Sequence, residues 1–532
     1  MEFPRLDSAS LTAWLKRAAS YVASEANSSL PTHTASDPMK PVAVPLPALT
    51  ALPYVRRFLL AQLMLAWDEG LNRTLPAEAE EPLGRLIQQL YGIHVASFRA
   101  RGVAEYFHIS KTGGTSWNEA ASEHGCAHSP NLGNHIKEFN DECRWLDMET
   151  YMRSTGGHRI LWARWGMVQR RTVYRTCQER YEHMVARGLS YASNEYTLVG
   201  GMRGPEAARP CPQVVNLVTL REPLKRLESA IRFVTVYVKG FWNRRDKERY
   251  EEAFERAGWC NTTLDFWSRL APAISDNYFV RSFLGEKGFH LPVGSLTEDH
   301  VSLAQEQLAS GFDLVFDLES GTEVNDDLAW QGLGWPVVLS KTHGLKSDVL
   351  PRRIGVRFDP QTCRIHPPDW DALRQRQALD VQFYAFGRVV HMLDALWLRL
   401  AAALGLQPDV APHMALALGS GPGPGRLRTK DPSNFTSCGM LWRGSDRSAL
   451  ALALGLERNG TAARRHEEPG RPRWGSGWQG GRGGGQAGRL GGRGRGGQEA
   501  GGDREEEVEE QDGEGEGEGE EEVDPHGDTE IV

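Results

Sequence analysis

A short apolar run that ends in a glycine-containing turn restricts the fold of this chain more than any other feature. It reads Phe-His-Ile-Ser-Lys-Thr-Gly-Gly-Thr-Ser-Trp and spans residues 107–117. Residues 104–109 have the aromatic and apolar composition of a strand, and residues 116–124 fit a helix. The two glycines between them allow a tight turn whose backbone N–H groups converge in front of the helix N-terminus. The segment therefore predicts a strand, an anion-binding turn and a helix in succession.

Strand-like and helix-like segments alternate over residues 103–400, which predicts an α/β domain with helices flanking a central parallel sheet. The expected strands are residues 104–109, 196–200, 213–220 and 312–317. The expected helices are residues 116–124, 223–238, 250–255, 275–283, 302–310 and 378–403. Three further helical stretches and a proline-rich segment precede them, and we expect residues 1–100 to form a stem or an accessory helical region.

The chain changes character at its C-terminal end. From about Gly419 it is dominated by Gly, Arg, Ser and Pro, and it closes on an acidic run. The last 32 residues carry 16 acidic side chains and one arginine, so residues 1–500 have a net charge of +7 against −8 for the whole chain. Such a composition buries too little apolar surface to offset the entropy of ordering. We therefore predict a folded domain over residues 101–405 and a disordered, low-complexity tail over residues 406–532.

The position of Lys111 separates this turn from a nucleotide-triphosphate loop. In the triphosphate pattern G-x-x-x-x-G-K-[ST] the lysine follows the glycines, whereas Lys111 precedes Gly113 and Gly114. We also find no convincing set of carboxylates for the Mg²⁺ that such a loop requires. Both observations count against an ATPase or a GTPase.

A second anion-binding pattern begins 110 residues after Lys111, in the segment Val-Val-Asn-Leu-Val-Thr-Leu-Arg-Glu-Pro-Leu-Lys-Arg-Leu-Glu-Ser. A predicted strand ends at Arg221, and Pro223 stands at the first position of a predicted helix. Arg221 can form a forked contact with a phosphate group. Ser229, eight residues after Arg221, can reach the same anion if the chain turns back sharply between them. The two patterns together predict a ligand that carries anionic groups at both ends.

These two patterns resemble those of the sulfotransferases that use PAPS (3′-phosphoadenosine 5′-phosphosulfate), and they are most similar to those of the Golgi glycan O-sulfotransferases of the heparan sulfate 2-O and 6-O type. The resemblance covers residues 103–400 and implies a P-loop-like sulfotransferase domain. It implies that Arg221 and Ser229 bind the 3′-phosphate of PAPS. It implies that the 5′-phosphosulfate is held by a loop made of Ser110, Lys111, Thr112, Gly113, Gly114, Thr115 and Ser116. The Arg-Lys-Gly string of the cytosolic sulfotransferases is absent, so a third contact to the 3′-phosphate is unassigned.

Sulfuryl transfer needs a base for the acceptor hydroxyl and a cation for the leaving oxygen, and it requires no metal. Lys111 is the expected cation. The resemblance implies a histidine base in a Gly-His context followed by aromatic residues, and His158 fits it best. The alternatives are a glutamate between the two motifs or one of three histidines in the same interval: His124, His128 and His135.

His108 is expected to be structural, because its side chain faces opposite to those of Phe107 and Ile109 in the predicted strand. Tyr278 and Arg281 either contact the donor or acceptor or pack inward on a helix. A basic stretch at residues 241–259 either lines a glycan-binding cleft or is a solvated helix face.

The cysteines and the glycosylation sequons indicate in which cellular compartment the protein is expected. Five Asn-x-Ser/Thr sequons favour the secretory pathway, and the resemblance implies the Golgi lumen or membrane, although we see no signal peptide and no transmembrane segment. A zinc set drawn from Cys126, His128, His135 and Cys143 fits no common spacing. In a lumenal domain a Cys126–Cys143 disulfide is preferred, with Cys177–Cys211 as the second candidate.

The sequence therefore predicts the transfer of a sulfuryl group from PAPS to a hydroxyl acceptor, with a glycan as the expected acceptor. One alternative is a nucleotide-phosphate kinase or hydrolase that uses the same loop. Another is a non-catalytic binding protein that acts through its tail, whose Arg/Gly-rich block has the composition of segments that bind RNA weakly. A solvated tail is the preferred interpretation of that block.

Overall fold

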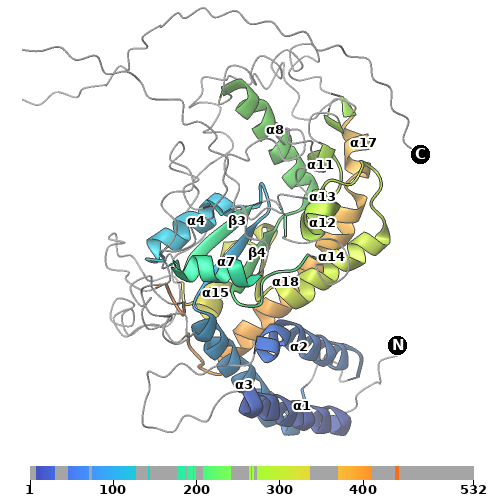
Figure 1. The fold of residues 1–532 in the computed structure, drawn as a ribbon. Coiled ribbons are helices and arrows are strands. Elements are labelled where there is room, and N and C mark those ends of the chain that lie inside the picture. The colour runs from blue at the N-terminus through green and yellow to red at the C-terminus, as the bar shows by residue number, and fades with distance from the viewer. Residues whose placement is uncertain are drawn as a thin grey trace, which may run out of the picture. The chain divides into compact units, whose positions relative to one another are not determined.

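The structure of this protein is a computed structural model (Figure 1). It describes residues 8–29, 46–70, 75–127, 142–143, 177–186, 189–195, 197–198, 208–240, 263–264, 267–268, 272–335, 369–408 and 438–441. The described residues contain a parallel β-sheet with helices against both of its faces, so the α/β class is confirmed. Residues 250–255, predicted to be helical, lie outside these ranges.

The sheet has the strand order β2-β3-β1-β4-β5, and every neighbouring pair is parallel. Its strands are β1 (Ala104–His108), β2 (Glu142–Cys143), β3 (Tyr191–Glu195), β4 (Val215–Leu220) and β5 (Leu314–Asp317). Three of the four predicted strands match β1, β4 and β5 to within two residues at each end. All residues of these three strands are buried, as expected where helices cover both faces of a parallel sheet.

The fourth predicted strand was wrong. We expected residues 196–200, but the strand between β2 and β1 is β3, with Tyr191 opposite Ala104. Leu198 lies outside the sheet, and its N–H donates to the carbonyl of Ser282 at 3.0 Å. The apolar composition of residues 196–200 suggested a strand, whereas β3 carries the polar residues Ser193 and Asn194, both of which are buried. Tertiary pairing with β1 overrides the weak intrinsic preference of these residues.

The helices divide between the two faces of the sheet. One core packs Phe107, Val218 and Val315 against α8, α12 and α14, and the other packs Tyr106, Leu217 and Phe316 against α3, α4 and α15. These helices are α3 (Ala77–Arg101), α4 (Gly114–Glu123), α8 (Pro223–Gly240), α12 (Tyr278–Phe283), α14 (Glu298–Gly311) and α15 (Thr322–Leu333). The long helix α18 (Ala378–Ala403) contributes to both cores and has the bounds that we predicted.

Other helices complete the described part of the chain. They are α1 (Ser8–Ser29), α2 (Leu46–Leu65), the π-helix η1 (Ala66–Gly70), α7 (Cys177–Ala186), α11 (Pro272–Ser275), α13 (Gly285–Phe289), the 3₁₀ helix η3 (Leu318–Ser320) and α17 (Trp370–Gln375). The predicted helix 275–283 is divided into α11 and α12, because Asn277 adopts a left-handed conformation with φ of 48°. Helices α7, α13, α15 and α17 were not predicted.

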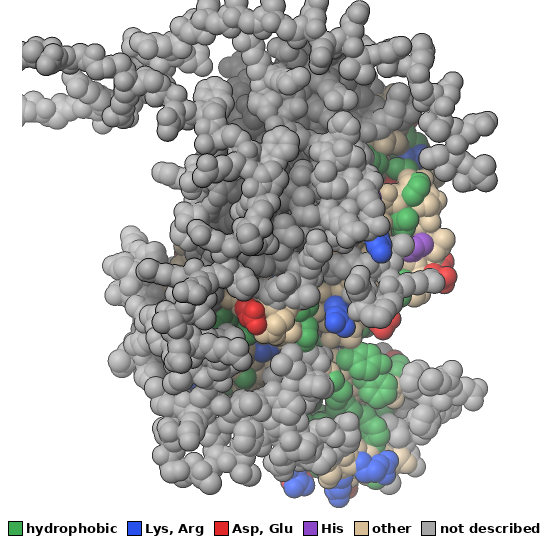
Figure 2. All heavy atoms as spheres, viewed as in Figure 1, with side chains coloured by type: hydrophobic (Ala, Val, Ile, Leu, Met, Phe, Trp, Pro, Cys, Tyr) green, Lys and Arg blue, Asp and Glu red, His purple; other side chains and the backbone are tan. Residues whose placement is uncertain are grey.

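The N-terminal helices share a core with the sheet domain. Residues of α1, α2 and α3 belong to the same apolar cluster as β1, β4 and β5. Helix α2 buries Arg56 and Arg57, which both pair with Asp394 of α18. Its outward side is apolar, with Tyr54 and Phe58 about half exposed, and hydrophobic side chains gather over α1 and α2 in the lower part of Figure 2.

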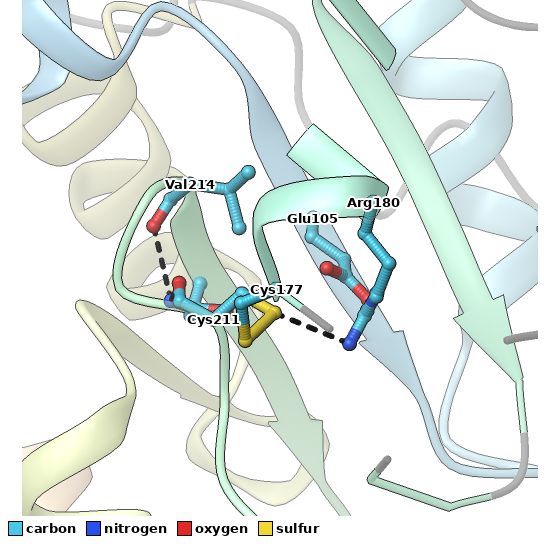
Figure 3. Close-up of a disulfide and its surroundings, with 6 residues drawn as sticks. Glu105, Cys177, Arg180, Cys211 and Val214 are labelled. Atoms are coloured by element: carbon cyan, nitrogen blue, oxygen red, sulfur yellow. Dashed lines mark hydrogen bonds and ion pairs between the residues drawn. A yellow bond between two sulfur atoms is a disulfide. The ribbon is translucent and has the colours of Figure 1, made fainter. Parts of the chain in front are cut away.

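Two disulfides cross-link the described residues. Cys177 bonds Cys211, as predicted for that pair, and Arg180 Nη1 lies 3.3 Å from Cys211 Sγ (Figure 3). The prediction for Cys126 was wrong, because its partner is Cys438, with a Cα–Cα distance of 4.5 Å, and not Cys143. The two bonded residues are 312 positions apart in the chain, so only the folded structure brings them together. This disulfide also removes Cys126 from any zinc set.

Four residues inside the predicted tail pack against the domain. Cys438 is fully buried, Met440 and Leu441 are nearly so, and the Met440 N–H donates to the carbonyl of Leu333 at 2.9 Å. Gly439 has φ of 58°, and a Cβ there would lie 2.1 Å from the Leu333 carbonyl oxygen. The chain therefore returns to the domain at residues 438–441, beyond the boundary at residue 405 that composition indicated.

Candidate functional site

The two motifs predicted to bind anions meet at one edge of the sheet. The chain leaves β1 through α4 toward β2, and it leaves β4 through α8 toward β5 on the other side. Neighbouring strands whose connections diverge in this way form a topological switch point, where open α/β sheets hold their ligands beyond the carboxyl ends of the strands. Arg221 Nη1 donates to the carbonyl of Lys111 at 3.1 Å. The structure thus brings Lys111 and Arg221 together at this point.

The turn after β1 is tight and partly left-handed. Lys111 has φ of 71° and Gly113 has φ of 93°. The Thr112 N–H and hydroxyl both donate to the carbonyl of Ile109, at 3.2 and 2.7 Å. Helix α4 starts at Gly114, and the N–H groups of Ser116 and Trp117 return to the carbonyl of Gly113 at 3.0 and 3.3 Å. Thr115 lies in the first turn of α4.

The start of α4 supplies an electropositive surface. The first N–H groups of any helix lack intrahelical acceptors, and the helix dipole adds partial positive charge at the same end. Ser110, at the entrance of the turn, is fully buried, and its hydroxyl has no hydrogen-bond partner among the described residues. A buried hydroxyl without a hydrogen-bond partner costs free energy unless a bound group supplies the missing hydrogen bond. This arrangement can hold an oxyanion.

His108 fixes the identity of Gly114. The ring is buried, and a Cβ added to Gly114 would lie 2.1 Å from two of its atoms. His108 also lies on the same side of β1 as Tyr106, with ring centroids 6.1 Å apart, which agrees with its predicted structural role. The close contact leaves no room for any side chain at the first position of α4.

Replacement of Gly114 by alanine is expected to displace the His108 ring or the turn and to lower the melting temperature by several degrees, since overpacking of this kind costs about 1–3 kcal/mol. Gly92→Ala in α3 is the matched control, because no described residue lies within 4 Å of a Cβ at that position. We expect Gly92→Ala to be neutral or slightly stabilising. Thermal unfolding followed by circular dichroism measures both, and equal melting temperatures for the two variants would contradict the packing described.

Arg221 lies in a charged setting at the same edge. Its side chain is 27 % exposed, and Nε lies 4.0 Å from Glu319 Oε1. Burial lowers the pKa of Arg221, while Glu319, Glu228 and Glu222 oppose that shift. Lys225 forms an ion pair with Glu319. An anion that enters here must therefore compete with the Glu319 carboxylate for Arg221.

Ser229 is half-buried on α8, two turns beyond Arg221. His158, the predicted base, lies outside the described residues, as do His128, His135 and the basic stretch 241–259. Tyr278 and Arg281 are both buried. Arg281 pairs with Asp276 and donates to the carbonyls of Phe289 and Leu291 at 3.1 and 2.6 Å, so it holds the chain around α12 in place.

His124 is poorly placed to act as the base. It caps the far end of α4, opposite the turn, and its ring stacks on Trp335 at 5.1 Å. Burial lowers the pKa of His124 to about 3. Burial therefore favours the neutral ring in the folded protein.

The depressed pKa of His124 has a measurable consequence. The unfolded chain takes up a proton as pH falls through the ordinary value of 6.5, whereas the folded chain does so only near 3, so stability is lost on acidification between these values. Between pH 7 and pH 5, we expect the free energy of unfolding of His124→Phe to fall by about 2 kcal/mol less than that of the wild type. Urea unfolding at the two pH values measures the difference, and identical losses would show that folding does not lower the pKa of His124.

Two carboxylates at the end of β5 were not singled out from the sequence. Asp317 Oδ1 accepts from the Tyr384 hydroxyl at 2.9 Å, and Asp317 Oδ2 lies 3.7 Å from Arg388 Nε. Burial and this carboxylate raise the pKa of Tyr384. Glu319 follows in η3. The sequence did contain a signal for them, because acidic residues at the end of a predicted parallel strand are expected at the edge of the sheet where ligands bind.

The fold and the site define an α/β protein whose parallel sheet carries a basic, glycine-containing turn at its topological switch point. No family model, curated protein or solved structure matches the chain. No cluster of three or more metal-ligating side chains occurs within the described ranges. The same part of the chain contains no helix long and apolar enough to cross a bilayer.

Proposed function

We propose that this protein is a PAPS-dependent sulfotransferase that transfers a sulfuryl group to a hydroxyl group of a glycan. The observation that carries the proposal is the 3.1 Å hydrogen bond from Arg221 to the carbonyl of Lys111. It joins two segments that the sequence marks separately as anion-binding, and it does so at the switch point of the sheet. A ligand with anionic groups at both ends fits that pairing.

The residues of the site have distinct roles under this proposal. The turn from Ser110 to Ser116 and the α4 N-terminus bind the phosphosulfate end of the donor through N–H and hydroxyl groups. Lys111 neutralises the charge that develops on the leaving oxygen. Arg221 and Ser229 bind the 3′-phosphate, and His158 removes the proton from the acceptor hydroxyl.

The proposed compartment is the Golgi lumen. The Cys126–Cys438 and Cys177–Cys211 disulfides support it, because such bonds persist in oxidising compartments and are rare in the cytosol. The five sequons support the same compartment.

Thermal unfolding with PAP, the desulfated product of the donor, tests the proposal. In metal-free buffer, PAP at 100 times its dissociation constant is expected to raise the melting temperature by about 3–6 °C, because it binds only the folded chain. Arg221→Ala should abolish most of this shift. Stabilisation by ATP with Mg²⁺ but not by PAP would favour the kinase or hydrolase alternative, and no response to either would favour a non-catalytic protein.

A transfer assay identifies the acceptor. Labelled PAPS is offered with a panel of polysaccharides, tyrosine peptides and small alcohols. Label is expected in a polysaccharide, and label in a tyrosine peptide alone would refute the glycan assignment.

A further inference from the structure

Arg226 stands out among the buried charges of the described residues. It lies near the start of α8 and is fully buried, and none of its three guanidinium nitrogens has a hydrogen-bond partner among the described residues. Its Cζ lies 4.4 Å from the ring centroid of Tyr278 and 5.6 Å from that of Phe279. Burial lowers the pKa of Arg226, and the nearby carboxylate of Asp380 opposes the shift. Ring faces attract the cation, but they accept none of its N–H groups.

The other buried arginines of this part of the chain behave differently. Each of them forms an ion pair with a carboxylate. The pairs are Arg56–Asp394, Arg57–Asp394, Arg101–Asp313, Arg180–Glu105 and Arg281–Asp276. The fold thus provides an acidic partner for a buried guanidinium, as desolvation of the charge requires. Among the described residues Arg226 is the exception.

Asp380 is the carboxylate that comes nearest to filling this role, and it is engaged elsewhere. Its two oxygens accept from the N–H groups of Phe279 and Val280, each at 2.9 Å. It therefore holds the start of α12, and within the described ranges none of the Arg226 nitrogens bonds to it. The acceptor that Arg226 lacks is not supplied by these side chains.

Arg226 lies on α8 between two residues that we expect to bind an anion, Arg221 and Ser229. Ser229 lies three residues further along the same helix, and side chains at this spacing are neighbours. Arg221, at the start of the helix, is close enough to affect the pKa of Arg226 by charge repulsion. Arg221, Arg226 and Ser229 thus follow one another from the end of β4 into the first turns of α8. Like charges so close together are stabilised when an anion lies among them.

We propose that Arg226 is a third contact for the anionic group that Arg221 and Ser229 bind, a phosphate monoester at the 3′ position of the nucleotide. This inference rests on the proposed function. The guanidinium lies against the Tyr278 ring, and under this proposal a rotation of the side chain brings its N–H groups to the phosphate oxygens. Arg226 therefore determines the preference for a nucleotide that carries a 3′-phosphate over one that does not.

Titration calorimetry with PAP and with AMP, which lacks the 3′-phosphate, tests this role. The wild type is expected to bind PAP at least 100-fold more tightly than AMP, as several charge-assisted hydrogen bonds imply. In Arg226→Met the ratio should fall at least tenfold, with the affinity for AMP unchanged. Lys287→Gln is the control, since it removes a charge from an exposed position in α13, and it should alter the ratio less than threefold.

Thermal unfolding of the ligand-free variants separates this role from a structural one. Replacement of a buried, unpaired charge by an apolar side chain of similar volume is expected to leave the melting temperature unchanged or to raise it. If Arg226 is only a structural cation held by the two rings, Arg226→Met destabilises the protein and leaves the PAP-to-AMP ratio intact. That pair of results would overturn the inference.

A second variant covers the case in which Arg226→Met does not fold. Arg226→Lys keeps the charge but loses the planar fork, so its PAP-to-AMP ratio should fall about fivefold. An unchanged ratio in this variant would also overturn the inference. A wild type that binds neither nucleotide, or binds both equally, refutes the proposed function itself, and the inference falls with it.

Discussion

Replacement of Asp394 by asparagine is expected to lower the free energy of unfolding by about 3–5 kcal/mol, which is the usual cost of leaving a buried ion pair half-made. Asp394 Oδ1 lies 2.7 Å from Arg56 Nη2, and Asp394 Oδ2 lies 2.7 Å from Arg57 Nη2. The carboxylate also accepts from the Val315 N–H at 3.0 Å. The substitution removes the only carboxylate that both arginines contact in the described structure, and it weakens the contact between α18 and β5.

Urea unfolding followed by circular dichroism measures this effect. Asp371→Asn is the matched control, because Asp371 is 89 % exposed and its partner Arg374 lies 3.5 Å away on the surface. We expect that control to change the unfolding free energy by less than about 0.5 kcal/mol. Equal stability of the Asp394 and Asp371 variants would mean that the N-terminal helices are not held to the domain through Asp394.

Replacement of Lys111 by alanine is expected to reduce sulfuryl transfer by about 10²–10³-fold, the usual effect of losing one stabilising group at a developing oxyanion. The affinity for PAP should fall far less, because the turn and Arg221 still bind the nucleotide. The backbone supports a functional side chain here. Lys111 adopts φ of 71°, a conformation that costs a non-glycine residue about 1–2 kcal/mol. A strained residue of this kind is often retained for its side chain.

Lys111→Gly separates the side chain from the backbone. Glycine relieves the strain at this φ, so we expect the variant to be at least as stable as the wild type and yet as inactive as Lys111→Ala. Lys287→Ala, at an exposed position in α13, controls for the loss of a surface charge. Transfer from labelled PAPS together with calorimetry for PAP measures both properties, and full activity in either Lys111 variant would remove the lysine from the reaction.

The candidate site was partly visible in the sequence because two of its segments have local signatures. A strand, a glycine pair and a helix start identify the turn around Lys111, and a strand that ends in an arginine before a proline identifies Arg221. Glu319 and Arg226 have no such signature. Glu319 lies near Arg221 only because β5 pairs with β4 in the sheet. Arg226 stands out only because no carboxylate among the described residues pairs with its buried guanidinium, and no local sequence pattern reveals that.

From the sequence alone we predicted the α/β class, three of the strands and the whole of α18, because hydrophobic periodicity and turn residues are local properties. The Cys177–Cys211 pair was only a second candidate at that point. Only the tertiary structure decided that Ser193 and Asn194 lie in a central strand, that Cys126 bonds Cys438, and that Lys111 meets Arg221. These contacts join residues far apart in the chain, and the free energy of each depends on which elements lie side by side. A local sequence pattern contains no information about such neighbours.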